Sequence, residues 1–236
     1  MTLLRPLDAV VAWVVNFVSV QSVSIVAFAL GITLASAPGW AVAGVIRIGA
    51  VVVVISWLWL IRGVRLEELR GLFPTSRRSI AVGAFLGMAL STVEYLIVVA
   101  VHLIDRTPNL VDGTRNPWVA TRSLADTSFV FAVVFVIVGP VVEEFIHRGV
   151  AYPGLRSRLR IPAAAILSSV VFALGHDWTV FDFASAFAFG LVAVWLVERY
   201  RSLSPAIAAH VVSNLVVVIV GWSLYNLFGI PGTIVG

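Results

Sequence analysis

The chain has 236 residues, of which 60% are hydrophobic and only 12% are charged, and its mean hydropathy is +1.04. The hydrophobic fraction and mean hydropathy lie above, and the charged fraction below, those of soluble globular domains, which indicates a polytopic membrane protein. The formal net charge is +4, and the 16 basic residues, all arginine, lie in short clusters between apolar runs, so the composition gives no support to nucleic-acid binding. The sequence has no cysteine, which excludes a disulfide framework, a thiolate nucleophile and a cysteine metal site.

About seven apolar runs are long enough to predict membrane-spanning helices, because a helix needs roughly 20 mainly apolar residues to cross a bilayer. The predicted spans are 10–35, 40–61, 80–104, 128–152, 161–176, 183–197 and 203–228. The fifth and sixth are short, so the count ranges from six to eight. No linker is long enough to separate domains, and we predict an all-α helical bundle in which residues 1–236 form a single integral membrane domain.

The third span contains Gly83 and Gly87, whose small-xxx-small spacing allows another helix to approach closely. It also contains Glu94, a lone charge like Arg47 in the second span. Isolated charges are costly in lipid, so we expect these two residues to pair with each other or with a polar site elsewhere in the bundle.

The arginines predict how the spans are oriented. With a cytoplasmic N-terminus, eleven arginines lie inside, three lie outside, and Arg47 and Arg148 lie within spans. This asymmetry is what the positive-inside rule requires. We therefore expect a multi-pass protein of the plasma or inner membrane, with its N-terminus in the cytoplasm and its C-terminus outside.

The fourth span is the predicted functional centre, because it places ionisable side chains inside an apolar run. Glu143 and Glu144 point about 100° apart on a helix, so their roles should differ. Glu144 and Arg148 are four residues apart with the glutamate first, which favours an intrahelical ion pair and leaves Glu143 for another partner. His147, between them, is expected to line the lipid interface or a cavity.

Two further spans carry a histidine in a pair of residues with the same four-residue spacing. Phe172 and His176 share one face of the fifth span, and His210 and Asn214 share one face of the seventh. A carboxylate, two imidazoles and an amide around one cavity suffice for hydrolysis, as a general base, a proton relay and two oxyanion donors. A Glu/His/His set also matches a metal site with water in the fourth position.

Together these residues resemble the CAAX protease and bacteriocin-processing family (CPBP, or ABI) of intramembrane proteases, which includes the type II CAAX prenyl endopeptidase. The family motifs are Glu-Glu-x-x-x-Arg, Phe-x-x-x-His and His-x-x-x-Asn on successive membrane helices. In this chain they begin at Glu143, Phe172 and His210, in that order. The resemblance covers about residues 128–218, which we interpret as the core that carries the motifs.

The resemblance implies a role for each motif residue. Glu143 matches the catalytic glutamate, and His176 matches its partner in activating water. His210 and Asn214 match the pair proposed to hold the oxyanion. The supporting positions are Glu144, Arg148 and Phe172.

The resemblance leaves the cofactor open. Both a metal-dependent mechanism and a glutamate mechanism without metal are proposed for the family. In the metal-dependent case, Glu143, His176 and His210 would bind a divalent metal such as zinc.

The sequence thus predicts an endopeptidase that hydrolyses a peptide bond at or within the bilayer, with membrane lipid and a membrane-associated or lipid-modified peptide or protein as partners. A prenylated CAAX protein, a bacteriocin leader and a membrane regulator are all candidate substrates. Two other classes stay open. One is a transporter or proton-relay protein that uses Glu143, His176 and His210 as a path, and the other is an inactive membrane scaffold in bacteriocin self-immunity.

Overall fold

A computed structural model describes the chain except for residues 1–3, 35, 75, 106–123, 177–179 and 229–236. All regular structure in the described residues is helical, as expected in lipid, where the backbone satisfies its hydrogen bonds within helices. The elements are α1 (Pro6–Ala29), α2 (Ala37–Ser56), the π-helix η1 (Trp57–Ile61), α3 (Leu66–Arg70), α4 (Arg77–Asp105), α5 (Leu124–Val133), the π-helix η3 (Val134–Val138), α6 (Gly139–Glu144), the π-helix η4 (Phe145–Ala151), α7 (Tyr152–Arg156), α8 (Ile161–Leu174), α9 (Val180–Tyr200) and α10 (Ser204–Phe228). The predicted all-α class is confirmed.

Each predicted span has a helical counterpart. Residues 124–156 form one continuous helix through α5, η3, α6, η4 and α7, which we call the central helix. Five described segments are long and apolar enough to cross a membrane: 6–29, 37–61, 77–97, 129–156 and 180–200. The shorter apolar helices are α8 and the part of α10 from Ser204 to Val220. The chain is therefore a multi-pass membrane protein.

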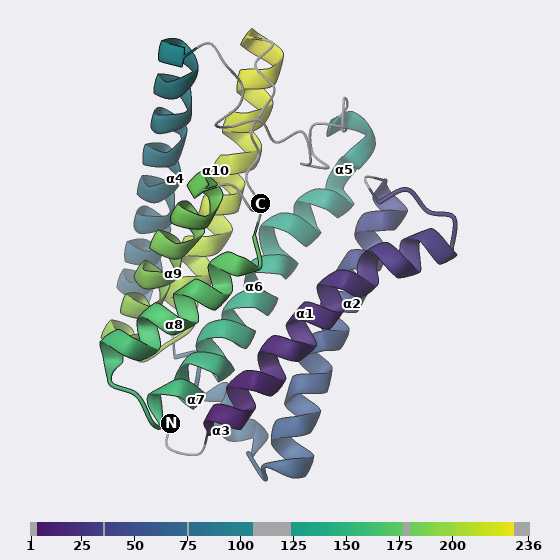
Figure 1. The fold of residues 1–236 in the computed structure, drawn as a ribbon. Coiled ribbons are helices and arrows are strands. Elements are labelled where there is room, and N and C mark those ends of the chain that lie inside the picture. The colour runs from purple at the N-terminus through teal and green to yellow at the C-terminus, as the bar shows by residue number, and fades with distance from the viewer. Residues whose placement is uncertain (1–3, 35, 75, 106–123, 177–179, 229–236) are drawn as a thin grey trace.

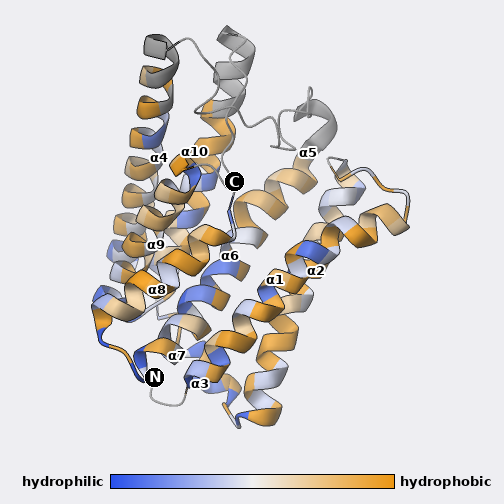
Figure 2. Ribbon diagram, viewed as in Figure 1, coloured by the Kyte–Doolittle hydropathy of each residue, from blue (hydrophilic) through white to orange (hydrophobic). Residues whose placement is uncertain are grey.

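The central helix runs obliquely through the bundle, with α1 and α2 on one side and α4, α8, α9 and α10 on the other (Figure 1). The outer surfaces are mostly apolar, whereas α6 carries a hydrophilic patch inside the bundle (Figure 2). Large side chains on the outside include Phe28, which is 87% exposed, and Phe17, which is 66% exposed. Exposed apolar surface of this extent suits lipid rather than water.

α4 packs closely against α10, which confirms the prediction from the glycine spacing. A Cβ atom on Gly83 would overlap the carbonyl of Pro205, and one on Gly87 would overlap the carbonyl of Ala209. The same face of α4 continues with Ser91, whose hydroxyl lies 2.6 Å from the hydroxyl of Ser213. The two backbones therefore lie in direct contact, which fixes the position of α10 and of the polar residues on it.

The contact at Gly87 predicts a difference between two glycine substitutions. Gly87→Ala should lower the free energy of unfolding by about 1–3 kcal/mol, because the added methyl group forces two packed backbones apart. Gly49→Ala is the matched control, since a Cβ at this exposed position of α2 meets no atom within 4 Å. Unfolding titrations in detergent micelles measure both, and equal effects would contradict the proposed contact.

Candidate active site

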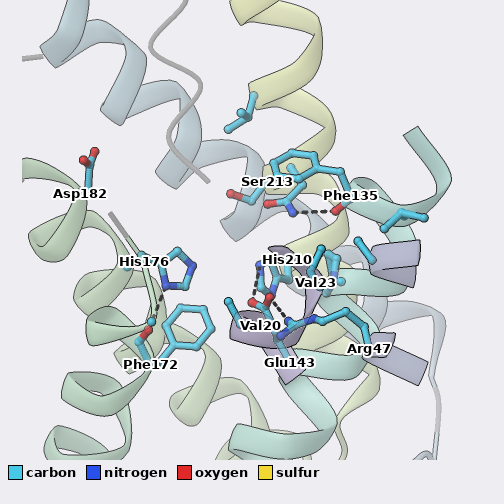
Figure 3. Close-up of a pocket in the computed structure, with 18 of the residues that line it drawn as sticks. Val20, Val23, Arg47, Phe135, Glu143, Phe172, His176, Asp182, His210 and Ser213 are labelled. Atoms are coloured by element: carbon cyan, nitrogen blue, oxygen red, sulfur yellow. Dashed lines mark hydrogen bonds and ion pairs between the residues drawn. The ribbon is translucent and has the colours of Figure 1, made fainter. Parts of the chain in front are cut away.

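The three sequence motifs meet at one cavity of about 410 Å³ (Figure 3). Glu143 of α6, His176 at the end of α8, and His210 and Asn214 of α10 all contribute to its lining. Residues of α1, α2, α4 and α9 complete the wall. The structure therefore places all four predicted catalytic residues around a common space inside an apolar bundle.

Glu144 and Arg148 form the predicted ion pair, and His210 joins it. Arg148 Nη1 lies 3.1 Å from Glu144 Oε1, and neither side chain is exposed at all. His210 Nδ1 lies 2.9 Å from the same oxygen. Because a carboxylate oxygen accepts, Nδ1 carries the proton and donates it to Glu144. The other ring nitrogen, Nε2, then faces Glu143, at 3.9 Å from its Oε2.

Phe172 connects α8 to the Glu144–Arg148 ion pair by packing against Arg148. The guanidinium carbon of Arg148 lies 4.1 Å from the centre of the Phe172 ring, a cation–π contact. The ring of His147 packs edge-on against Phe172, with centroids 5.2 Å apart. His147 is buried in the interior, so the expectation of a lipid-interface or cavity-lining position was wrong. The motif phenylalanine thus stacks against the charged residue of the preceding motif.

The four-residue spacing of Phe172 and His176 has a local cause. α8 ends at Leu174, and in its last turn the carbonyl of Phe172 accepts from the backbone N–H of Gly175 at 3.1 Å, which leaves room for a second donor. His176 Nδ1 lies 2.9 Å from the carbonyl oxygen of Phe172 and donates to it. In the neutral ring Nε2 is then an acceptor. Within the described part of the chain, no hydrogen bond joins His176 to Glu143, and Figure 3 shows Glu143 beside His210 and Arg47, with His176 set apart from them.

Glu143 is paired with an arginine of α2, on the side of the central helix away from α8 and α10. Arg47 of α2 forms an ion pair with Glu143 Oε1, and Arg47 Nη1 donates to Asn16 Oδ1 of α1 at 2.9 Å. Of the two pairings left open by the sequence, Arg47 thus adopts the one with the site. Its presence in an apolar span was the signal for this role. The partner, Asn16, could be identified only from the fold.

Two carboxylates line the same cavity away from Glu143. Glu94 of α4 and Asp182 of α9 both contribute to the wall. The prediction placed Asp182 in the connection before the sixth span, but α9 begins at Val180 and buries this residue. Sequence reasoning missed Asp182 because the predicted helix began three residues too late.

Asn214 is positioned by an irregularity in the central helix. Pro140, five residues after Phe135, has no N–H, and the N–H of Gly139 donates to Val134 within the π-helix η3. Asn214 Nδ2 donates to the Phe135 carbonyl at 2.9 Å. The amide thereby takes the place of a helical donor. Because an amide nitrogen carries two hydrogens, a second N–H remains for another acceptor.

Comparison with known proteins agrees with the motifs. Residues 125–216 match the family model of the type II CAAX prenyl endopeptidase Rce1-like proteins. The matched segment contains all three motifs, and the resemblance predicted for about residues 128–218 is confirmed over it. No curated protein and no solved structure matches the chain. At a general level, the family supports a CAAX-type membrane protease.

Glu143, His176 and His210, the side chains proposed as metal ligands, are not arranged to bind one metal ion. In the regions that the structure describes, no group of three or more histidine, aspartate or glutamate side chains could hold a metal ion. One oxygen of Glu143 faces Arg47, whose positive charge repels a cation at that position. His210 directs Nδ1 to Glu144.

The buried pair makes a prediction about stability. Glu144→Gln or Arg148→Met alone should lower the free energy of unfolding by about 3–5 kcal/mol, because each leaves an uncompensated buried charge. The double variant should lose much less than the sum of the two single losses. Unfolding in detergent micelles measures this double-mutant cycle. Additive losses would show that the two charges do not stabilise each other.

Proposed function

We propose that the chain is an intramembrane endopeptidase that hydrolyses a peptide bond at or within the bilayer, in a membrane-associated or lipid-modified substrate. The observation that carries this proposal is the convergence of a carboxylate, two imidazoles and an amide on one cavity. The family match to CAAX-type proteases supports the same class of reaction.

Glu143 is the proposed general base. Its Oε1 is paired with Arg47, which orients the carboxylate and leaves Oε2 on the side of His210. This second oxygen can accept a proton from a water molecule in the cavity. His176 presents Nε2 as a further acceptor from across the cavity, because Nδ1 is bound to Phe172. The two groups together would activate the water.

His210 and Asn214 are the proposed oxyanion donors. The second N–H of Asn214 can donate directly to a developing oxyanion, and Asn214 is already oriented by Phe135. His210 can donate from Nε2 when the ring is doubly protonated, with Glu144 accepting from Nδ1. Hydroxide adds to the carbonyl carbon, the C–N bond breaks, and the departing amine takes a proton from Glu143 or His176.

The residues that line the cavity also help to distinguish the protease from a transporter and from an inactive scaffold. A transporter would show a solute or proton flux that depends on Glu143, His176 and His210, and a scaffold would tolerate their substitution. Asn214 favours the protease, because an amide that neither gains nor loses protons suits an oxyanion site better than a proton path.

The first test is cleavage by variants of the proposed base. Glu143→Gln and His176→Ala should each reduce cleavage of a quenched, prenylated CAAX peptide by about 10²–10⁴-fold, the usual contribution of general acid–base catalysis. The assay uses purified protein in lipid nanodiscs, and unfolding titrations check the fold. Glu67→Gln, an exposed carboxylate of α3, is the control and should cleave like wild type. Wild-type rates in both variants would refute the assigned roles, and a flux in liposomes without cleavage would favour the transporter.

The second test addresses metal dependence. Cleavage should survive complete metal removal by a chelator, because Glu143 is paired with an arginine in the arrangement described above. Metal analysis of the purified wild type and of Glu143→Ala, beside the cleavage assay, provides the measurement. Loss of activity that zinc restores would instead identify Glu143, His176 and His210 as metal ligands.

A further inference from the structure

Arg47 lies on the wall of the active-site cavity and does not use all of its hydrogen-bond donors. A guanidinium has five N–H groups. Nη1 of Arg47 donates to Asn16 and Nη2 donates to Glu143, and these are the two hydrogen bonds that its side chain makes within the described residues. The side chain is 10% exposed and contributes to the cavity lining. Three N–H groups therefore remain for a ligand that enters the cavity.

The charges on the cavity wall are separated. Among the residues that the structure describes, Arg47 is the only arginine in the lining. Two acidic residues of the lining, Glu94 and Asp182, interact electrostatically with each other. Figure 3 shows Asp182 on the His176 side of the pocket and Arg47 on the opposite side. An anionic group in the cavity is thus attracted to the side of Arg47 and repelled from the side of the two acids.

Apolar side chains surround Arg47 in the wall. Figure 3 shows Val20 and Val23 of α1 on the same side of the pocket, and Ala43 lies one helical turn before Arg47 on the same face of α2. Charge interactions are stronger where apolar surface keeps water away. An ammonium group has no acceptor and is repelled by a guanidinium, whereas a carboxylate accepts two parallel N–H bonds from it. The chemistry at this position therefore suits a carboxylate.

We propose that Arg47 binds a carboxylate group of the substrate and is a specificity-determining residue of the active site. The same guanidinium contacts Glu143, the proposed base, so the bound carboxylate lies about one to three residues from the scissile bond, at roughly 3.3–3.6 Å per residue. The carboxylate belongs either to the C-terminus or to an acidic side chain of the substrate. The inference rests on the proposed function for the scissile bond and adds the chemistry of the substrate beside it.

This carboxylate subsite lies in the part of the chain that precedes the family match. Asn16 and Arg47 belong to α1 and α2, whereas the match covers residues 125–216. The helices that carry the motifs supply the proposed base and oxyanion donors, and α2 supplies the subsite. Because Arg47 also orients Glu143, a loss of activity on its substitution does not by itself reveal a subsite. The test therefore varies the substrate carboxylate and Arg47 together.

Two pairs of quenched, prenylated CAAX peptides provide the test. The first pair is a free acid and its C-terminal carboxamide, and the second is the carboxamide with glutamate or glutamine as its last residue. Wild-type protein should cleave the acidic member of at least one pair with a kcat/KM about 10–100-fold higher, as expected for hydrogen bonds to a charged group. Arg47→Met should abolish this preference. Arg47→Lys should retain part of it, because an ammonium keeps the charge without the planar fork.

Arg70→Met, at an exposed arginine of α3, is the control and should keep the wild-type preference. Equal kcat/KM values within both pairs for the wild type would overturn the inference. So would an unchanged preference in Arg47→Met, since a loss shared equally by all four peptides means that Arg47 acts only through Glu143. Unfolding titrations check each variant. If Arg47→Met does not fold, Arg47→Lys takes its place, and there a preference equal to that of the wild type would overturn the inference.

Equilibrium binding separates this inference from the proposed function. The same four peptides are prepared with an N-methyl group on the scissile amide to block hydrolysis, and fluorescence anisotropy measures their dissociation constants. Tighter binding of an acidic peptide to the wild type but not to Arg47→Met, in a protein that cleaves none of the unmodified peptides, would refute the protease and retain the subsite. Cleavage at equal rates and equal binding within both pairs would overturn the subsite and retain the protease.

Discussion

The buried charge of Arg148 is the constraint around which the site is built. A guanidinium with no exposure in an apolar bundle is strongly destabilising unless it is paired. Glu144 supplies the opposite charge from the same helix, and the face of Phe172 supplies a favourable surface from α8. His210 shares the paired oxygen of Glu144 from α10. Neutralising one charge thus brings three helical segments, and one residue from each motif, into contact.

The two adjacent glutamates contact different parts of the helical bundle. Glu144 faces the interior and holds the half that contains α8 and α10, whereas Glu143 faces the cavity and pairs with Arg47 of α2. Asn16 extends this second link to α1. The cavity lies where these two halves meet, so the residue assigned as the base is attached to one half while the proposed oxyanion donors belong to the other.

The sequence predicted those features that depend only on residues close together in the chain. Hydropathy located the seven helical segments, and the four-residue spacing of Glu144 and Arg148 predicted their ion pair, because both follow from helix geometry alone. The glycines of α4 likewise predicted a close helix contact, although not that α10 would be the partner. The link from Arg47 to Glu143 joins residues 96 positions apart, and nothing local distinguishes it from a pair with Glu94.

The bond from Asn214 to the Phe135 carbonyl lay beyond sequence reasoning for a different reason. It depends on a wide helical turn at η3, which hydropathy cannot detect, although Pro140 is a signal that a helical donor is missing nearby. The place of Asp182 in the cavity wall was not predicted, because the start of a helix is uncertain by a few residues and such a shift moves a side chain from a loop into the bundle.

The wide turn at η3 also sets the angular phase of everything after it. A π turn contains about one residue more than an α turn, which rotates the following residues by roughly 100° relative to an uninterrupted helix. That is the same angle that separates Glu143 from Glu144. A helical wheel drawn from Phe129 onward would therefore be one residue out of register when it reached the two acids, and would place Glu143 in the direction that Glu144 takes. A single surplus residue about two turns upstream thus helps to decide that Glu143 faces the cavity and Glu144 the packed interior.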